Sequence, residues 1–291
     1  DCQFENRKFM ISKDHNQNET NMQSADSSKN EDANAAVDAP VKTSVISDFW
    51  RALALLSRVP VHGIDDFRAE LIARSVWSWP LVGLLLAGFA MLPAMLVYQL
   101  TENILIFEII ALAGMVLLTG CMHEDGMADC ADGFGGGFER ARKLEIMRDS
   151  QIGTYGVVAL ILCFGLRLVL MSVAGDGGQA AILFLVMAIS SRAAMPIMMH
   201  ILPPARNDGL GKGAGRPSLM MVGLAVLIAA ILAFVLTGLV TTVVVLAGAL
   251  LAVGLVAMVA KWQIGGQTGD VLGATQLLSE LFVGIAFVAV I

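Results

Sequence analysis

The chain has 291 residues, of which 56% are hydrophobic and only 15% are charged. This composition and a mean hydropathy of +0.72 exclude an ordinary soluble domain and indicate a protein that crosses a membrane several times. The formal net charge of −6 argues against nucleic acid as a partner, because DNA and RNA are bound by basic surfaces.

Residues 1 to 45 are rich in Asn, Asp, Ser, Ala and Lys and show no apolar periodicity. They contain no apolar run long enough for a signal peptide, so we expect a disordered polar tail in the cytoplasm. Residues 46 to 291 are expected to form one membrane-embedded domain. In residues 45 to 61, apolar side chains recur at helical spacing with Arg51 and Arg58 among them, which predicts an amphipathic helix lying at the membrane interface.

Seven segments are apolar enough to cross a bilayer, which takes about 20 apolar residues. They are residues 76 to 99, 103 to 122, 154 to 174, 179 to 202, 218 to 238, 240 to 260 and 275 to 291. The last segment is short, so we expect an all-α bundle with six or seven transmembrane helices. Lys and Arg outside the spans fall only before the first span or in residues 123 to 153, 203 to 217 and 261 to 274, which places these parts in the cytoplasm.

Ionisable residues inside a span are costly in lipid, and they indicate a function or a partner. Arg167 and Arg192 fall in the third and fourth spans, and Glu108 in the second span is a candidate partner for either. Pairing that stabilises the bundle is the simplest interpretation.

The loop after the second span carries three carboxylates, those of Asp125, Asp129 and Asp132. They are four and three residues apart, so a helix would present all three on one face. Like charges on one stripe repel each other unless a cation lies between them, and oxygen ligands near phosphate favour Mg²⁺ or Mn²⁺. The spacing therefore predicts a metal site, with a solvated acidic face as the alternative.

A second acidic pair, Glu145 and Asp149, follows at helical i, i+4 spacing. Basic residues lie around this pair, namely Arg140, Arg142, Lys143 and Arg148. Carboxylates that hold a metal, together with basic groups that hold anions, are typical of phosphoryl transfer. The sequence contains no Walker A, EF-hand or HExxH pattern.

The loop of residues 203 to 217 contains Arg206, Asp208 and Lys212, separated by glycines. On the same membrane face as the acidic residues, such groups can bind a pyrophosphate or a nucleotide. The alternative is a turn that merely follows the preference for basic residues in cytoplasmic loops. Asp270, in the next cytoplasmic loop, is a weaker candidate.

Two runs in this region, HEDGMADCADGF (123 to 134) and LEIMRDSQIGTYG (144 to 156), closely resemble the signature of the cobalamin synthase family. Five further segments resemble family segments in family order: RALALLSRVPV (51 to 61), WPLVGLLLAG (79 to 88), SSRAAMPIMM (190 to 199), ARNDGLGKG (205 to 213) and GGQTGDVLGA (265 to 274). The resemblance covers nearly everything from residue 48 onward. Glu124 departs from the family pattern, in which an apolar residue is more usual, and we assign it no role.

The resemblance implies an adenosylcobinamide-GDP ribazoletransferase, the enzyme of the final step of vitamin B12 assembly. Its substrates would be adenosylcobinamide-GDP and α-ribazole or α-ribazole 5′-phosphate, and its products adenosylcobalamin or its phosphate, together with GMP. The implied location is the bacterial cytoplasmic (inner) membrane, with lipid around the chain and the active site facing the cytoplasm. A homo-oligomer and other membrane-associated enzymes of cobalamin assembly are candidate partners.

In this interpretation residues 46 to 291 are the catalytic domain, and Asp125, Asp129 and Asp132 hold Mg²⁺. Asp149 is the expected general base, with Glu145 as a further ligand or as the residue that orients the base, and the two roles can be exchanged. The expected substrate contacts are Arg140, Arg148, Arg206, Asp208 and Lys212.

Two alternatives remain at this point. One is another Mg²⁺-dependent intramembrane transferase, such as a CDP-alcohol phosphotransferase. That family expects DGxxAR, whereas Asp125 and Gly126 are followed by MADC, which has no Arg. The other alternative is a transporter, but its acidic residues should lie along the spans, and here they lie together in one loop.

Overall fold

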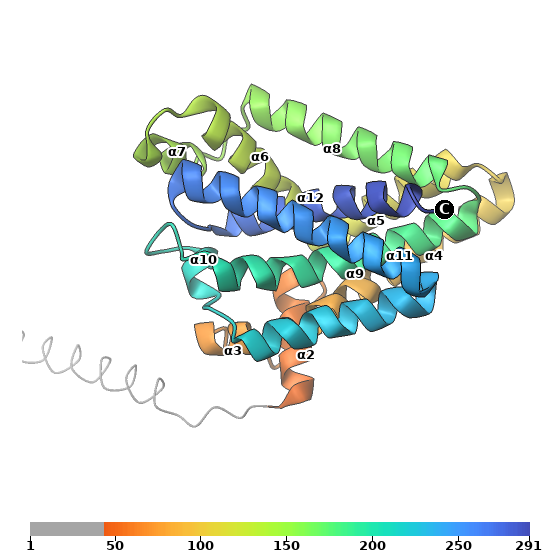
Figure 1. Cartoon of the computed structure of the whole chain (residues 1–291), viewed down its shortest axis with the longest axis horizontal. Helices are drawn as coiled ribbons and strands as arrows, with labels where there is room; N and C mark the ends of the chain where they lie inside the picture. The colour runs from red at the N-terminus through yellow and green to blue at the C-terminus, as the bar shows by residue number, and fades with distance from the viewer. Residues whose placement is uncertain (1–43) are drawn as a thin grey trace, which may run out of the picture. The chain divides into compact units, whose positions relative to one another are not determined.

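The computed structural model describes residues 44 to 291, and Figure 1 shows this part as a bundle of helices. Its regular structure is helical, apart from one isolated β-bridge between Pro204 and Gln267. The predicted all-α fold is therefore confirmed. Almost all of the predicted tail, residues 1 to 45, lies outside the described residues.

In chain order the helices are α2 (Val45–Leu56), α3 (Ala69–Ser75), the 3₁₀-helix η1 (Val76–Ser78), α4 (Trp79–Thr101), α5 (Ile104–Thr119), α6 (Met122–Gly136), α7 (Arg140–Ile146), α8 (Thr154–Val173), α9 (Gly177–Ile201), α10 (Leu210–Gly213), α11 (Leu219–Ile264) and α12 (Gly269–Val288).

Five helical segments among the described residues are long and apolar enough to span a membrane, and a sixth is possible if α5 and α6 together form one bent span. At about 1.5 Å per residue, α11 is twice as long as one crossing of a hydrocarbon layer about 30 Å thick. Gly238 interrupts it with a left-handed φ of 77°, and the chain turns back there, so that the two halves run in opposite directions along the bundle in Figure 1. They match the two predicted spans 218 to 238 and 240 to 260.

Helix α2 runs across the direction of the long helices in Figure 1, as an interfacial helix would. Its first turn is capped by Ser44, whose hydroxyl accepts the N–H of Ile46. The helix ends at Leu56, before the predicted end at residue 61. Arg51 is buried beside the buried Asp48 instead of lying in the interface, with 3.3 Å between their charged groups.

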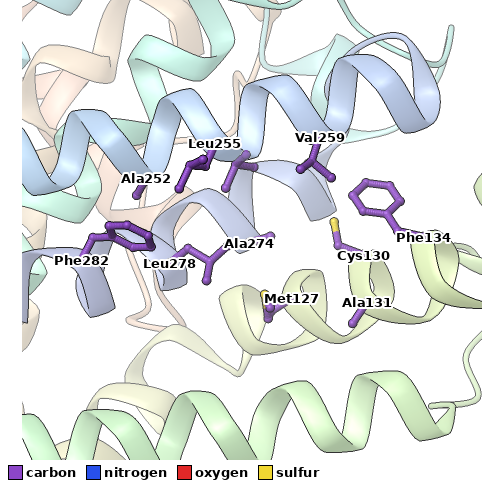
Figure 2. A pocket seen from close by; sticks show the side chains of 11 residues that line it. Met127, Cys130, Ala131, Phe134, Ala252, Leu255, Val259, Ala274, Leu278 and Phe282 are labelled. Carbon is purple, nitrogen blue, oxygen red and sulfur yellow. The ribbon is translucent and has the colours of Figure 1, made fainter. Parts of the chain in front are cut away.

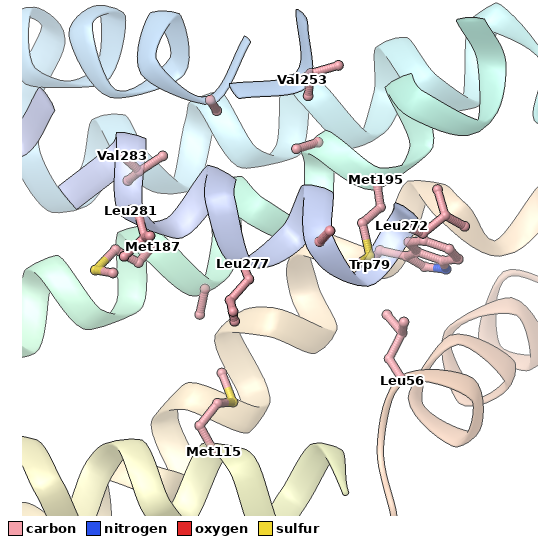
Figure 3. Packing of buried hydrophobic residues seen from close by; sticks show 14 of the residues in the cluster. Leu56, Trp79, Met115, Met187, Met195, Val253, Leu272, Leu277, Leu281 and Val283 are labelled. Atoms are coloured by element: carbon pink, nitrogen blue, oxygen red, sulfur yellow. The ribbon is translucent and has the colours of Figure 1, made fainter. Parts of the chain in front are cut away.

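Helices α9 and α12 form the centre of the bundle, because most of their residues are buried. Figure 3 shows the packing around them, in which Leu277 of α12 lies near Met115 of α5, and Leu56 of α2 points toward Trp79. Branched side chains and flexible methionines fill this core, so the many methionines are packing residues. The core also holds the start of α12, which lies beside the candidate site.

Candidate active site

Helix α6 carries the predicted acidic stripe, and a sharp bend before it sets the direction in which the stripe faces. α5 ends at Thr119, and the next two residues, Gly120 and Cys121, both have left-handed φ angles, of 65° and 60°. Glycine adopts this conformation freely, whereas a residue with a Cβ atom does so rarely. As a result α5 and α6 are bent by 86° relative to each other, and the predicted span 103 to 122 is wrong at its end.

Asp125 and Asp129 lie one turn apart on α6 and line a cavity of about 300 Å³. The segment after α7 contributes Arg148 and Asp149 to the same cavity. Asp125 is exposed and Asp129 is half-buried. The structure therefore brings four of the predicted site residues together, two from each of the two family-like runs.

Asp132 has a different environment, although it lies on the same helix. It is only 9% exposed, and its two carboxylate oxygens accept the backbone N–H groups of Gly153, at 2.7 Å, and Gly156, at 2.9 Å. These N–H groups belong to the first turn of α8, which has no cap from its own N-cap residue. A carboxylate there satisfies free donors and complements the helix dipole.

Both glycines are required by this contact. A Cβ atom on Gly153 or on Gly156 would come within 2.4 Å of a carboxylate oxygen of Asp132. The run IGTYG thus serves the anchoring of α8, a role that the sequence pattern did not indicate. Asp132 does not line the cavity of Asp125 and Asp129.

Asp270, the weaker candidate in the sequence, lies beside the acidic pair. It stands in the first turn of α12, whose cap is Thr268, and this threonine hydroxyl also donates to the Asp270 carboxylate at 3.1 Å. Gly126 of α6 packs directly on it, because a Cβ atom at Gly126 would meet the Asp270 carbonyl oxygen at 2.8 Å. The side chain pairs with Arg206 at 2.6 Å.

The carboxylate of Asp129 is consequently surrounded by charge. The residues near enough to act on it are Asp125, Asp270, Asp132 and Arg206. Three of these are acidic and one is basic, so the site has an excess of negative charge. Such an excess of negative charge attracts cations and repels phosphate groups.

The predicted basic residues separate into two groups. Arg148 lines the cavity and bonds to both carboxylate oxygens of Asp208, at 2.5 and 2.6 Å. Arg140 lies elsewhere, since its guanidinium group donates to the carbonyl oxygens of Ile264 and Ala205 at 2.7 and 2.8 Å.

Two loops that the sequence predicts on the same membrane face are joined by hydrogen bonds. Ala205 donates its N–H to the Gln267 carbonyl at 2.8 Å, and Gln267 donates its own N–H to the Pro203 carbonyl at the same distance. The Gln267 side chain donates to the Gly211 carbonyl at 2.9 Å, and Lys212 follows as an exposed residue on α10. Residues 203 to 217 and 265 to 268 thus form one framework.

Glu145 lies outside the cavity, and its carboxylate pairs with Arg142 at 2.8 Å on the exposed face of α7. Asp149 is the better placed of the two predicted catalytic carboxylates. One of its oxygens accepts the N–H of Gln151 at 3.0 Å, which holds the side chain at the cavity wall.

The described part of the chain contains no group of three or more His, Cys, Asp or Glu side chains arranged to hold a metal ion. Magnesium, however, is commonly bound by one or two carboxylates together with substrate phosphates and water. Asp125 and Asp129 supply two carboxylates in one polar cavity. Their donor chemistry fits Mg²⁺ that is held jointly with a phosphate-bearing substrate.

A buried ionic network lies behind the first turn of α6. Glu124 pairs with Arg167 of α8 at 3.3 Å, and Arg167 also pairs with Glu280 of α12. Glu280 in turn accepts from Arg192 of α9 at 2.8 Å. The sequence assigned Glu124 no role.

The predicted pairing of Glu108 with either arginine is wrong. Glu108 accepts a hydrogen bond from Ser172 at 2.8 Å instead. The true partners come from the first turn of α6 and from α12, which sequence spacing alone does not reveal.

Comparison with known proteins finds a protein family that matches this chain. Residues 48–288 match the family described as cobalamin-5-phosphate synthase. The chain is 42% identical over 254 residues to the adenosylcobinamide-GDP ribazoletransferase of Sinorhizobium medicae, covering 82% of this chain and 96% of the relative. It is 39% identical over 244 residues to the protein of that name from Bradyrhizobium diazoefficiens, covering 82% and 92%. No solved structure matches.

Proposed function

The chain belongs to the cobalamin-5-phosphate synthase family, and from this premise we propose how its residues carry out the reaction. It is a multi-pass bacterial membrane protein, and its activity is that of a transferase in the final step of cobalamin assembly. The family match does not favour a CDP-alcohol phosphotransferase or a transporter. The substrates are adenosylcobinamide-GDP and α-ribazole or α-ribazole 5′-phosphate.

The reaction breaks a phosphoanhydride bond and forms a phosphodiester bond. A secondary hydroxyl of the α-ribazole ribose attacks the phosphorus that bears cobinamide, the bond from this phosphorus to the bridging oxygen breaks, and GMP leaves with that oxygen. In α-ribazole 5′-phosphate the 5′-oxygen already carries a phosphate, so the attacking hydroxyl must be one that is free in both substrates, which the secondary ribose hydroxyls are. In both cases the attacking hydroxyl loses a proton, and the pyrophosphate needs positive charge beside it.

The observation that carries the proposal is the cavity shared by Asp125, Asp129, Arg148 and Asp149. Asp125 and Asp129 are the residues that would hold Mg²⁺, which when bound supplies positive charge to the pyrophosphate and to the leaving group. Asp149 takes the proton from the attacking hydroxyl, because it lines the same cavity. Arg148 binds the phosphate groups in exchange for its present partner, Asp208.

Arg206 and Asp270 belong to the edge of this site. Their ion pair keeps the guanidinium group near the carboxylate of Asp129. Lys212 is exposed on the loop framework and is proposed to bind the guanosine diphosphate end of the substrate. We assign Asp132 to the anchoring of α8, and Arg140 to the support of the loops, in place of the predicted direct contacts.

The basic loops and the acidic cavity lie on the same side of the predicted spans, which supports a site on the cytoplasmic face of the inner membrane. Nucleotide substrates are available on that side. A homo-oligomer, or a complex with other enzymes of cobalamin assembly, stays a prediction.

The test is an assay of purified protein in nanodiscs with adenosylcobinamide-GDP, α-ribazole and Mg²⁺, in which GMP and the cobalamin product are both measured. Asp129→Asn should lower the rate by at least about 100-fold, the scale for one lost electrostatic group in an active site. Asp65→Asn, an exposed acidic residue outside the cavity, is the matched control. Full activity in Asp129→Asn, or full activity after chelation of Mg²⁺, would overturn the proposed site.

A further inference from the structure

A second cavity, of about 210 Å³, lies on the other side of α6 (Figure 2). Helix α12 forms its floor with Leu278 and Phe282, while α11 and α6 form its two walls. Leu255 and Val259 project from α11, and Met127 and Phe134 project from α6. Every residue that lines this groove is apolar.

The groove opens on the face of the bundle that meets the membrane. Leu255 is 40% exposed and Val259 is 37% exposed, although both belong to a spanning segment. Leu251 and Met258, on the same segment, are exposed as well. An apolar hollow of this kind is unfavourable in water, but in a bilayer it is in contact with acyl chains.

The groove and the acidic cavity lie back to back on α6. At about 100° per residue, Met127 and Phe134 point to the side opposite Asp125 and Asp129. Whatever fills the groove therefore supports the helix that carries the acidic pair.

The end of the groove near Phe134 and Val259 is bordered by groups that suit an anionic headgroup. One turn beyond Val259 on the same face of α11 stands Trp262, which is 81% exposed. Exposed Trp and basic residues at the end of a spanning helix mark the level of the lipid headgroups.

The charge at this end is positive on balance. Residues 139 to 145, together with Lys261, contain four basic and two acidic side chains. The ammonium group of Lys143 donates to the side chain of Gln263, which brings it to the end of α11. A lipid phosphate placed here would meet Trp262 and Lys143.

We propose that this groove binds an acyl chain of an anionic phospholipid, whose headgroup lies beside Trp262 and Lys143, and that the bound chain supports α6 from behind. This inference concerns a lipid site that is separate from the acidic cavity. It does not depend on the proposed roles of Asp125 and Asp129.

The experiment uses the full-length protein in nanodiscs that contain phosphatidylglycerol with a diazirine on one acyl chain. After illumination, labelled peptides are identified by mass spectrometry. The expected result is concentrated labelling of residues 252 to 259 and 127 to 134. The double variant Leu255→Trp/Val259→Trp, which fills the groove, should lose most of this labelling. Leu250→Trp, at an exposed residue that does not line the groove, should keep it.

The headgroup is tested by competition, with unlabelled phosphatidylglycerol or phosphatidylcholine added to the same nanodiscs. Phosphatidylglycerol should compete better, and Lys143→Gln, which removes the ammonium group at this end of α11, should reduce this preference about fivefold. Equal competition by the two lipids would contradict the proposal that the site prefers an anionic headgroup. Labelling spread evenly over all exposed apolar helices, or crosslinks between two protein copies through the groove, would overturn the lipid site.

Discussion

Asp132 accepts the backbone N–H of Gly156 at 2.9 Å and thereby joins the acidic helix α6 to the start of the spanning helix α8. Its second oxygen accepts the N–H of Gly153. One carboxylate therefore replaces the missing cap of α8, and the direction of α6 is fixed relative to α8. The predicted acidic stripe divides into two parts, of which Asp125 and Asp129 face the cavity.

Gly156→Ala tests this anchor. The new Cβ atom would lie 2.4 Å from an oxygen of Asp132 and 3.1 Å from the Cβ of Ala128, so we expect a loss of about 1 to 3 kcal/mol of stability. Gly165→Ala is the matched control in the same helix, since nothing lies within 4 Å of its Cβ position. The measurement is unfolding in detergent. Equal stability of the two variants would contradict the contact.

Asp132→Asn separates anchoring from metal binding. An amide can accept only one of the two N–H bonds well, so we expect a loss of about 1 kcal/mol of stability. The Mg²⁺ concentration that gives half-maximal activity should stay unchanged, whereas Asp125→Asn and Asp129→Asn should raise it. A Mg²⁺ requirement raised equally in all three variants would restore Asp132 as a ligand.

The helical spacing of Asp125, Asp129 and Asp132 was predicted correctly, because i, i+3 and i, i+4 positions share a face wherever a helix forms. The destination of Asp132 was not predictable. It depends on the bend at Gly120 and Cys121 and on the position of Gly153, the N-cap of α8, which lies 21 residues after Asp132. The number of spans was easier to predict than their ends, because composition determines a span and local turns determine where it stops.

The position of Asp270 beside the acidic pair was not predictable from the sequence either. Its position in a glycine-rich loop gave little reason to favour it, and only the close approach of Gly126 places it beside Asp129. The sequence shows the glycines of GGQTGD and HEDG. It does not show that α6 and α12 pack on each other at these glycines.

Gly126→Ala tests this helix contact. A Cβ atom there would lie 2.8 Å from a backbone oxygen and 3.0 Å from the Cα atom of Asp270, and neither can rotate away. The two helices must therefore move apart, and we expect activity to fall at least about tenfold through the displaced carboxylates. Gly254→Ala, with open space at its Cβ position, should be fully active. Normal turnover in Gly126→Ala would show that the site tolerates this shift.

The buried network can be tested by a double-mutant cycle at Glu124 and Arg167. Glu124→Leu leaves two arginines against one glutamate inside the bundle, and we expect it to cost about 3 kcal/mol or more. Combining it with Arg167→Leu should restore most of the stability, because Glu280 and Arg192 remain paired at 2.8 Å. Additive losses of stability in the double variant would show that the two residues do not interact.

Arg148 provides the sharpest test of substrate binding. Its pair with Asp208 is largely exposed, so Arg148→Gln should change stability little. If the guanidinium group exchanges Asp208 for the substrate pyrophosphate, the KM for adenosylcobinamide-GDP should rise about tenfold, as expected for the loss of one charge-assisted hydrogen bond. The KM for α-ribazole should stay the same.

Arg142→Gln is the matched control for this prediction. Arg142 is separated from Arg148 by less than two helical turns of sequence and also forms an exposed pair, with Glu145, but it does not line the cavity. A rise in KM in the Arg148 variant alone would place the pyrophosphate in the cavity beside Asp125 and Asp129. Similar rises in both variants would instead indicate a diffuse basic surface, because general attraction of an anionic substrate depends on total charge rather than on one position.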